Sequence, residues 1–515
     1  MSAPAVRSYD VAVVGMGPVG SVAAALLAHA GLRVYACDRV ATQPETRSPV
    51  TLDDDVLRVL NQIGALGMIL PHLQPLAGFD CCGVDGQLIY RSRRQRYPVD
   101  TRARHRTYLL CQGDLERALR QRLMQTRSVT LGLGHELTEL RSGDSNSNVK
   151  LALRRVGQNI CETIGAAWLV ACDGASSTVR QLLGIQLENM GFDETWLVVE
   201  ARIRERALAK LPQVTTQFCD PAGPYRYTVG PGNHRRWDLC LGLSENAPAN
   251  THEHAWKLLS QWIEREDAEL CSVSTHRCGV ALAERWRSGR VFLAGDAAQI
   301  QPSFMGQGLC QGIRDVANLA WKIASIQRGS VCGLAAERMI KSYRRERRDP
   351  SYLLLQGVSA ACAMWTERDQ AKARERDARM LAEERRLAYR PELENEWVPQ
   401  LQTGFLGPDP SLARGQKFPE FRIRLSAGDA VSIDHHFGFG WRLIIDPLLR
   451  VPELIDGIDV IPIGGHGFTE TETVVADWMR AYECRAVLLR PDHYVYGAAK
   501  TANTLRRLLV HWRKS

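Results

Sequence analysis

The sequence predicts an α/β fold with a parallel sheet near the N-terminus, a second sheet in the middle of the chain and a small α/β unit at the end. Three observations support this. Residues 9–38 contain a valine-rich strand, a glycine-rich turn, an alanine-rich helical stretch and a second strand, an order typical of a parallel sheet. Short strands dominate residues 195–282. Strands and helices alternate again over residues 429–512.

The first turn, Gly15-Met16-Gly17-Pro18-Val19-Gly20, is a G-x-G-x-x-G motif between a strand and a helix. Gly15 allows the sharp turn, Gly17 lets backbone approach a pyrophosphate, and Gly20 lets the helix pack closely on the sheet. The helix N-terminus favours phosphates through its free N–H groups and its dipole. Asp38 ends the second strand, where an acid can bind an adenosine ribose. The motif predicts a dinucleotide, and by itself leaves both FAD and NAD(P) open; a plain turn is the alternative.

Composition and charge exclude several classes of protein. The chain has 515 residues, of which 45% are hydrophobic and 24% charged, as in an ordinary globular protein. The net charge of +8 is modest, and no basic run is interleaved with aromatics, so we expect no nucleic-acid partner. The lack of a long apolar stretch and of room for a signal peptide predicts a cytoplasmic protein with no membrane contact. The 14 cysteines form no C-x-x-C pair, which is typical of reduced cytosolic thiols.

Helical spacing over residues 56–63 follows Asp53-Asp54-Asp55, and we interpret these acids as helix capping rather than a metal site. Residues 330–390 are strongly helical and charged, and a linker containing prolines leads to the last unit. His435-His436 lacks partners at ligand spacing, so no metal is expected.

Three separated motifs together resemble those of the single-component FAD aromatic hydroxylases, the class A flavoprotein monooxygenases. They are the first glycine turn, Asp173-Gly174 after a strand, and Gly295-Asp296 after a strand. The text GRVFLAGDAA, followed by GQG and GIRDVANLAWKIA, is similar to the family's second FAD motif almost throughout. The stretch at 219–237 and LLRPDHYVYG near the end resemble the branch that contains 3-(3-hydroxyphenyl)propionate hydroxylase and aromatic polyketide hydroxylases.

The resemblance covers nearly the whole chain and implies four parts. A discontinuous Rossmann-like FAD-binding domain of the aromatic hydroxylase type would comprise residues 1–75, 105–190 and 285–330, with an inserted substrate-binding sheet at 76–104 and 191–284. A helical connector would follow at 331–395, then a thioredoxin-like C-terminal domain at 418–515. That domain retains only Cys484, so we expect a structural or assembly role instead of dithiol chemistry.

The resemblance also implies which residues bind the cofactor. Arg47 would lie near the pyrophosphate, Gln112 near the ribityl chain, and the backbone of Leu137 at the adenine. Asp173 is linked to both FAD and the nicotinamide donor, and Asp296 to the ribityl chain or pyrophosphate. The helix opening at 306–309 would face the flavin ring, where its N-terminus stabilises negative charge. The full expected set is Gly15, Gly17, Pro18, Gly20, Asp38, Arg39, Arg47, Gln112, Leu137, Asp173, Gly295, Asp296, Gly306, Gln307, Gly308 and Leu309.

The implied activity is hydroxylation of a phenolic ring by O2 through a flavin C4a-hydroperoxide, with non-covalent FAD reduced by NADH or NADPH. A 3-(3-hydroxyphenyl)propionate-like acid is one candidate substrate. Hydroxylation, epoxidation or Baeyer–Villiger oxygenation of a polycyclic natural product is an alternative, and a flavin-binding protein without oxygenase activity is another. A homodimer is left open.

Two positions depart from the family pattern, since Gln299 stands where a histidine is usual and Ser303 where a second proline is usual. No catalytic base is identified, although His105, His234 and Tyr225 lie in the substrate-side segments.

Overall fold

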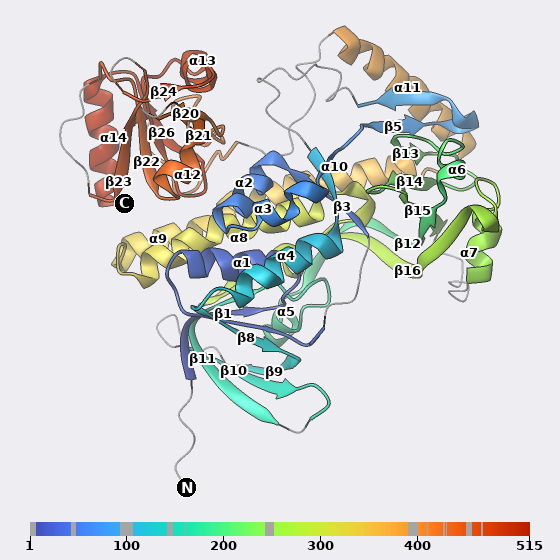
Figure 1. The fold of residues 1–515 in the computed structure, drawn as a ribbon, viewed down its shortest axis with the longest axis horizontal. Coiled ribbons are helices and arrows are strands. Elements are labelled where there is room, and N and C mark those ends of the chain that lie inside the picture. The colour runs from blue at the N-terminus through green and yellow to red at the C-terminus, as the bar shows by residue number, and fades with distance from the viewer. Residues whose placement is uncertain are drawn as a thin grey trace.

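The computed structural model describes residues 7–42, 48–92, 107–141, 148–158, 160–242, 252–389, 400–408, 410–425, 428, 430–449, 456–464 and 467–515. Figure 1 shows three bodies: an N-terminal sheet with helices above it, a second sheet to one side, and a C-terminal α/β unit on the other side. No helix in these ranges is long and apolar enough to cross a membrane.

The N-terminal sheet has a parallel centre. Strand β1 (Arg7–Val14) pairs in parallel with β2 (Val34–Asp38) and with β11 (Cys161–Ala171), and β11 pairs in parallel with β18 (Val291–Leu293). Parallel strands end at the same edge of a sheet, so the turns after β1, β11 and β18 meet there. The three motifs that are far apart in sequence are thereby brought to one edge.

Helices and smaller strands complete this part. Helices α1 (Pro18–His29) and α8 (Gly308–Gln327) bury apolar faces against the sheet, and α4 (Gln112–Met124) and α2 (Asp54–Gln62) lie beside them. The remaining strands are β8 (Val129–Leu133), the antiparallel ribbon β9 (His135–Arg141) and β10 (Val149–Arg155), the short β17 (Arg287–Ser288), and a small sheet of β3 (Pro49–Asp53), β7 (Thr107–Cys111) and β4 (Gln74–Pro75).

The second sheet has the order β19-β16-β12-β15-β14-β13-β5-β6. Its faces alternate residue by residue, as strand geometry requires. Leu197, Val199 and Trp237 pack on the face that carries α7 (His252–Leu259), and Trp196 joins the core shared with the first sheet. The strand bounds are β5 (Phe79–Cys82), β6 (Leu88–Arg91), β12 (Leu187–Ile203), β13 (Thr215–Phe218), β14 (Tyr225–Val229), β15 (His234–Gly242), β16 (Ala268–Ala283) and β19 (Gln299–Ile300).

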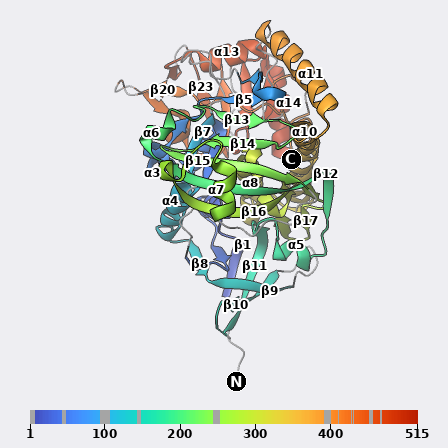
Figure 2. The same ribbon diagram turned by 90° about the vertical axis from the view of Figure 1, so that its right-hand side faces the viewer.

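Strand β19 joins the two sheets. The chain leaves the first sheet at β18, passes Gly295-Asp296 and then pairs with β16 of the second sheet, with Leu282 opposite Gln299. The segment that carries the second family motif therefore lies between the two sheets, and Figure 2 shows the second sheet in front of α8.

The connector consists of α9 (Gly333–Tyr343), a π-helical turn at Arg344–Arg348, α10 (Asp349–Trp365) and α11 (Gln370–Tyr389). The π-helical turn widens the helix locally. Within it the consecutive residues Glu346 and Arg347 are both buried. They reach different partners, one toward the C-terminal unit and one toward α8.

The C-terminal unit is built on the sheet order β23-β22-β25-β26. Strand β22 (Trp441–Ile445) is parallel to β23 (Ile458–Pro462) and antiparallel to β25 (Ala486–Leu489), which is antiparallel to β26 (Val495–Ala499). This order and these directions are consistent with the thioredoxin-like expectation. Outside the sheet lie β20 (Arg422–Arg424), β21 (Ala430–Ser432), β24 (Thr469–Glu470), α12 (Ile433–Phe437), α13 (Val474–Ala481) and α14 (Ala502–Lys514).

Buried ion pairs attach this unit to the rest of the chain. Arg58 on α2 pairs with Asp434 of α12, and Glu346 of the π-helical turn pairs with Arg490 at 2.6 Å. All four side chains are almost completely buried. The sequence suggests a separate tail, but these buried ion pairs fix the C-terminal unit to the rest of the protein.

Candidate functional site

Two glycines allow α1 to approach the ends of β1 and β11 closely. Gly15 has φ +92°, and a Cβ atom there would lie 2.4 Å from the carbonyl oxygen of Cys172. A Cβ atom at Gly20 would lie 1.8 Å from the carbonyl oxygen of Gly15. Both distances are far below contact, so neither position tolerates a side chain without movement of the backbone.

Gly17 has the opposite environment. It is the N-cap of α1, and a Cβ atom built on it would meet no other atom within 4 Å. Pro18 occupies the first helical turn, where its missing N–H is not needed. The space in front of this helix N-terminus is therefore free of protein, as binding of a phosphate group there requires. Gly174, after β11, also faces open space.

The carboxylate of Asp38 is fixed at the end of β2. It accepts hydrogen bonds from the backbone N–H groups of Met16, at 2.6 Å, and Val40, at 2.8 Å. Arg39, the next residue, is exposed. Arg47 lies outside the described residues, so its predicted place near a pyrophosphate stays a prediction.

Asp173 is held within its own turn. Its carboxylate accepts hydrogen bonds from the Ser177 hydroxyl at 2.5 Å and from the Val179 N–H at 3.0 Å, and burial raises its pKa. Arg180, which sequence reasoning did not single out, donates to the carbonyls of Ala175 and Ala297 at 2.7 and 3.1 Å. Arg180 thus ties the second motif to the third.

Asp296 faces the start of α8. One of its carboxylate oxygens lies 4.0 Å from the position that a Cβ atom would occupy on Gly308. Water reaches the side chain, although surrounding protein raises its pKa to about 6, chiefly by desolvation and then through the charge of Asp315. Desolvation reduces the stability of the charged form, so this carboxylate is suited to a partner that donates hydrogen bonds.

The turn before α8 is also anchored. Gly306 has φ +71°, and its carbonyl accepts a hydrogen bond from the Thr51 hydroxyl. Gln307 is buried and is the N-cap of the helix, which begins at Gly308, with Leu309 next. The N-terminus of a helix of 20 residues therefore opens beside Asp296.

Buried ion pairs hold α8 in place. Arg314 pairs with Asp53 at 2.6 Å and with Asp55 at 2.8 Å, and Arg347 pairs with Asp315 at 2.7 Å. Asp53 is the N-cap of α2 but makes no side-chain capping bond. Asp54 and Asp55 lie in the first turn of α2, as the capping interpretation expects, but the Asp53 side chain does not cap the helix. Asp53 and Asp55 instead neutralise a buried arginine on α8. No local spacing could reveal a pair 259 and 261 residues apart.

The two glutamines after Asp296 leave polar atoms without partners. Gln299 donates to Asp315 at 2.9 Å, but its side-chain oxygen has no partner. Both amide atoms of Gln301 are buried and lack partners, and its amide nitrogen lies 3.6 Å from the Cβ position of Gly308. Buried polar groups are nearly always hydrogen-bonded in a complete structure. Such atoms beside open helix N-termini fit a bound polar cofactor.

A charged cluster of the second sheet contacts this segment. Arg236 donates to the Ser303 hydroxyl at 2.8 Å, pairs with Asp238 at 2.6 Å and lies 3.7 Å from Glu200. Burial lowers the pKa of the nearby Arg226 to about 10, and its Nε atom has no partner. The sequence pointed to this stretch only through its resemblance to the family, without assigning these side chains.

Aromatic side chains border the same segment. Phe304 packs against Trp196 at 4.5 Å between ring centroids and against Trp365 at 6.4 Å. Tyr225, in contrast, stacks on Phe218 at 4.4 Å and receives a hydrogen bond from Trp262. Since Phe218 and Trp262 belong to the core on the α7 face, Tyr225 is directed away from this site.

The other predicted positions make contacts within their own elements or with an adjoining strand. The Gln112 amide donates to Glu116 at 2.7 Å at the start of α4. Leu137 is buried in β9, opposite Leu153 in the ribbon. His234 begins β15, and His105 lies outside the described residues.

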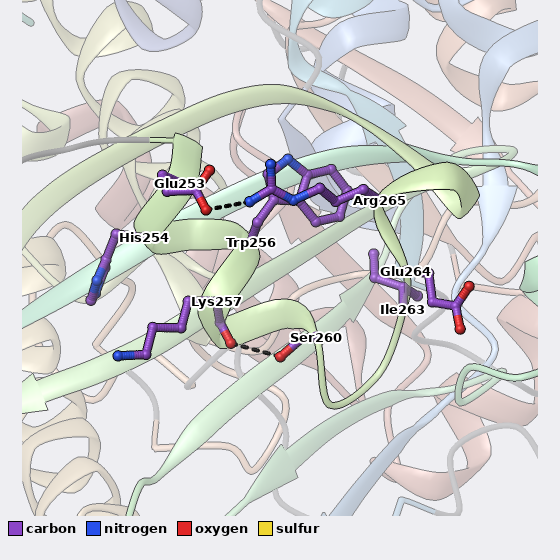
Figure 3. A pocket seen from close by; sticks show the side chains of 8 residues that line it. All are labelled: Glu253, His254, Trp256, Lys257, Ser260, Ile263, Glu264 and Arg265. Carbon is purple, nitrogen blue, oxygen red and sulfur yellow. Dashed lines mark hydrogen bonds and ion pairs between the residues drawn. The ribbon is translucent and has the colours of Figure 1, made fainter.

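A separate hollow on the outer side of the second sheet is shown in Figure 3. It borders α7, and the 2.5 Å ion pair between Glu253 and Arg265 crosses it. None of the cofactor-motif residues lines it.

Comparisons with known proteins agree with the geometry. The family model described as "FAD binding domain" matches residues 8–357. A probable NADH-specific resorcinol 4-hydroxylase of Rhodococcus jostii is 28% identical over 98% of this chain and 94% of its own. A 3-(3-hydroxy-phenyl)propionate/3-hydroxycinnamic acid hydroxylase of Klebsiella pneumoniae is 29% identical over 96% and 93%.

Solved structures share the fold. The flavin-dependent monooxygenase PieE, solved with FAD and substrate, matches with a TM-score of 0.82 over 99% of this chain and 98% of its own, at 20% identity. Aklavinone-11 hydroxylase, solved with FAD and aklavinone, matches with a TM-score of 0.77 over 99% and 100%, at 21% identity. Since the family model covers most of the chain, the protein belongs to the FAD-binding domain family, as an FAD-dependent monooxygenase of the aromatic hydroxylase type.

Proposed function

We propose that FAD lies along the edge where the three motifs meet. Its pyrophosphate occupies the open space at the N-terminus of α1, in front of Gly17, and its adenosine ribose binds Asp38. Asp296 binds the ribityl chain or pyrophosphate, and the flavin ring faces the N-terminus of α8. The free space at Gly17 and the partnerless amide of Gln301 support this arrangement.

The substrate that the site supports best is a small phenol, such as resorcinol or a 3-(3-hydroxyphenyl)propionate-like acid, hydroxylated with O2 and electrons from NADH or NADPH. The observation that carries this proposal is the buried cluster of Arg236, Asp238 and Glu200 against Ser303. The Arg236 guanidinium can donate hydrogen bonds to a phenol or carboxyl oxygen, while Asp238 and Glu200 balance its charge and fix its orientation. The bulky Phe304 and Trp196 favour a small ring over a polycyclic one.

When bound, FAD supplies the redox and oxygen chemistry, and the protein supplies position and electrostatics. Arg236 orients the substrate's oxygen, and Asp238 and Glu200 hold that guanidinium in place. The α8 N-terminus stabilises negative charge near the ring that it faces. Phe304 and Trp196 would exclude water from one side of the bound substrate.

The test is a screen of phenols with the purified, FAD-loaded enzyme. Resorcinol or 3-(3-hydroxyphenyl)propionate should accelerate NADH or NADPH oxidation at least about tenfold, equivalent to about 1.4 kcal/mol. Mass spectrometry under 18O2 should show one labelled oxygen in the product. Arg236→Met should raise KM for the phenol and leave FAD binding unchanged. Oxidation without labelled product for any phenol would contradict the proposal, and a labelled polycyclic product would favour the alternative substrate class.

Three further expectations belong to this proposal. The reduced-cysteine pattern supports action in the cytoplasm, and fractionation of cells would test it. A homodimer is testable by light scattering. The division into an FAD-binding domain, a substrate sheet, a connector and a C-terminal domain is supported by the separate sheets, and limited proteolysis would test its borders.

A further inference from the structure

A cavity of about 750 Å³ lies between the C-terminal unit and the far ends of α1 and α8. Leu26 and His29 of α1 line one side, with Ala320 and Trp321 of α8. Phe439 to Trp441 and Trp512 of the C-terminal unit line the other. The N-termini of the same two helices face the opposite way, toward the proposed cofactor site. In Figure 1 the C-terminal unit lies beside α1 and α9, away from the second sheet.

Two buried polar side chains in the wall of this cavity lack partners. Trp321 is 8% exposed and His493 is 2% exposed, and neither the Trp321 Nε1 nor the His493 Nε2 has a hydrogen-bond partner. Burying such groups unpaired costs stability. His493 also has φ +65°, a left-handed conformation that is uncommon for a residue with a side chain. Burial and neighbouring cations lower the pKa of His493 well below its usual value, so its ring is neutral.

The chemistry of the walls indicates the kind of ligand. Trp441 packs edge-on against Trp321 at 5.8 Å and against Trp512 at 5.6 Å, which leaves aromatic surface around the cavity. Indole N–H groups donate only, so the unpaired donor of Trp321 requires an acceptor. The residues that line the cavity include three exposed cations, Arg328, Arg513 and Lys514, and the exposed carboxylate of Asp456. The volume lies within the range of small-molecule sites, which often occur between domains.

We propose that this cavity is a second ligand site, separate from the catalytic one, that binds a planar aromatic acid. The ring lies among Trp321, Trp441 and Trp512. Its carboxylate or phenolate oxygen accepts from the Trp321 indole, close to the cations at the rim. Nothing in this site takes part in the proposed hydroxylation, so the site can exist whatever the substrate is.

The test uses 3-hydroxybenzoate, a single-ring phenolic acid, as the probe in a calorimetric titration of the FAD-loaded full-length enzyme without NAD(P)H. The catalytic site can also take an aromatic acid, so the readout is stoichiometry. Wild-type enzyme should bind two equivalents, and cyclohexanecarboxylate, which lacks the aromatic ring, should not occupy the second site. Gly440→Leu should bind one equivalent with turnover unchanged, because Gly440 lines the cavity and its Cβ position has ordinary clearance, 3.8 Å from Asp459.

Gly357→Leu is the matched control, because Gly357 is exposed on α10 with no atom within 4 Å of its Cβ position. It should keep two equivalents. Trp321→Phe retains a ring but lacks the indole N–H, so it should raise the dissociation constant of the second equivalent at least fivefold. This variant also provides the test if Gly440→Leu does not fold. A single equivalent in wild type that Gly440→Leu retains, or two unweakened equivalents in both cavity variants, would overturn the proposal. A single equivalent that Gly440→Leu abolishes would place the probe in this cavity and not in the catalytic site.

Discussion

Gly17 and Gly20 separate cofactor binding from folding within one motif. A Cβ atom at Gly17 meets nothing within 4 Å, and its backbone, at φ −64° and ψ −176°, suits any residue. Gly17→Ala should therefore change the free energy of unfolding of the apoprotein by less than about 1 kcal/mol. The same methyl group would enter the space proposed for the pyrophosphate. We expect the FAD dissociation constant to rise at least about tenfold, equivalent to about 1.4 kcal/mol.

Gly20→Ala should behave in the opposite way. Its Cβ atom would lie 1.8 Å from the Gly15 carbonyl oxygen, where ordinary contact begins at 3.4 Å. The backbone must move, and overpacking of this kind costs about 1–3 kcal/mol or more of apoprotein stability. The motif's glycines thus make different contributions, one to the ligand and one to the fold.

Two measurements on each variant test this contrast: urea unfolding of the apoprotein and flavin fluorescence titration with FAD. Gly17→Ala should lose affinity at nearly constant stability, and Gly20→Ala should lose stability first. If Gly17→Ala bound FAD as tightly as wild type, or if both variants lost stability equally, the assignment of Gly17 to the pyrophosphate would be refuted.

Other perturbations probe the site and its supports. Asp296→Ala should weaken FAD binding by about 1.5–3 kcal/mol, measured by the same titration, and an unchanged dissociation constant would leave Asp296 without a ligand role. The pKa of Asp296 in the folded protein is raised from 3.8 to about 6, so between these pH values the native apoprotein binds more protons than the unfolded chain. The stabilisation that Asp296 contributes is therefore present below pH 3.8 and is lost as the pH rises toward 6. Urea melts across this window should show that loss in wild type and a smaller one in Asp296→Asn, whereas identical profiles would contradict it. Glu346→Gln should destabilise the protein by about 3–5 kcal/mol in urea melts, because Lys322 and Arg490 are buried against this carboxylate at 2.7 and 2.6 Å. Glu383→Gln, which removes one member of an exposed ion pair, is the control and should leave the urea midpoint unchanged. Deleting residues 418–515 removes Asp434, the buried partner of Arg58, and Arg490, one of the two cations paired with Glu346, so the truncated chain should be insoluble. A soluble, FAD-loaded truncation would show that the tail is dispensable.

The sequence by itself determined the features that depend on short spacing. The turn at residues 15–20 is encoded locally, since strand, glycines and helix follow one another within a few residues. The family motif at 295–309 predicted α8 within a few residues of its observed start at Gly308. These local patterns, with the resemblance they carry, were sufficient for the fold and the FAD-dependent class, which the comparisons confirm.

Only the tertiary structure decided how the site is supported. Asp53 and Asp55 look like helix caps in sequence, yet they pair with Arg314 on a distant helix. The contact of Arg236 on β15 with Ser303, in the turn after β19, joins residues 67 positions apart. The physical reason is that a buried charge needs a partner of opposite charge, and packing can bring that partner from any part of the chain. The sequence separation of the two residues is therefore set by the fold and not by the local sequence. For the same reason the C-terminal tail, which appears independent in sequence, is attached to the catalytic body through Arg490 and Glu346.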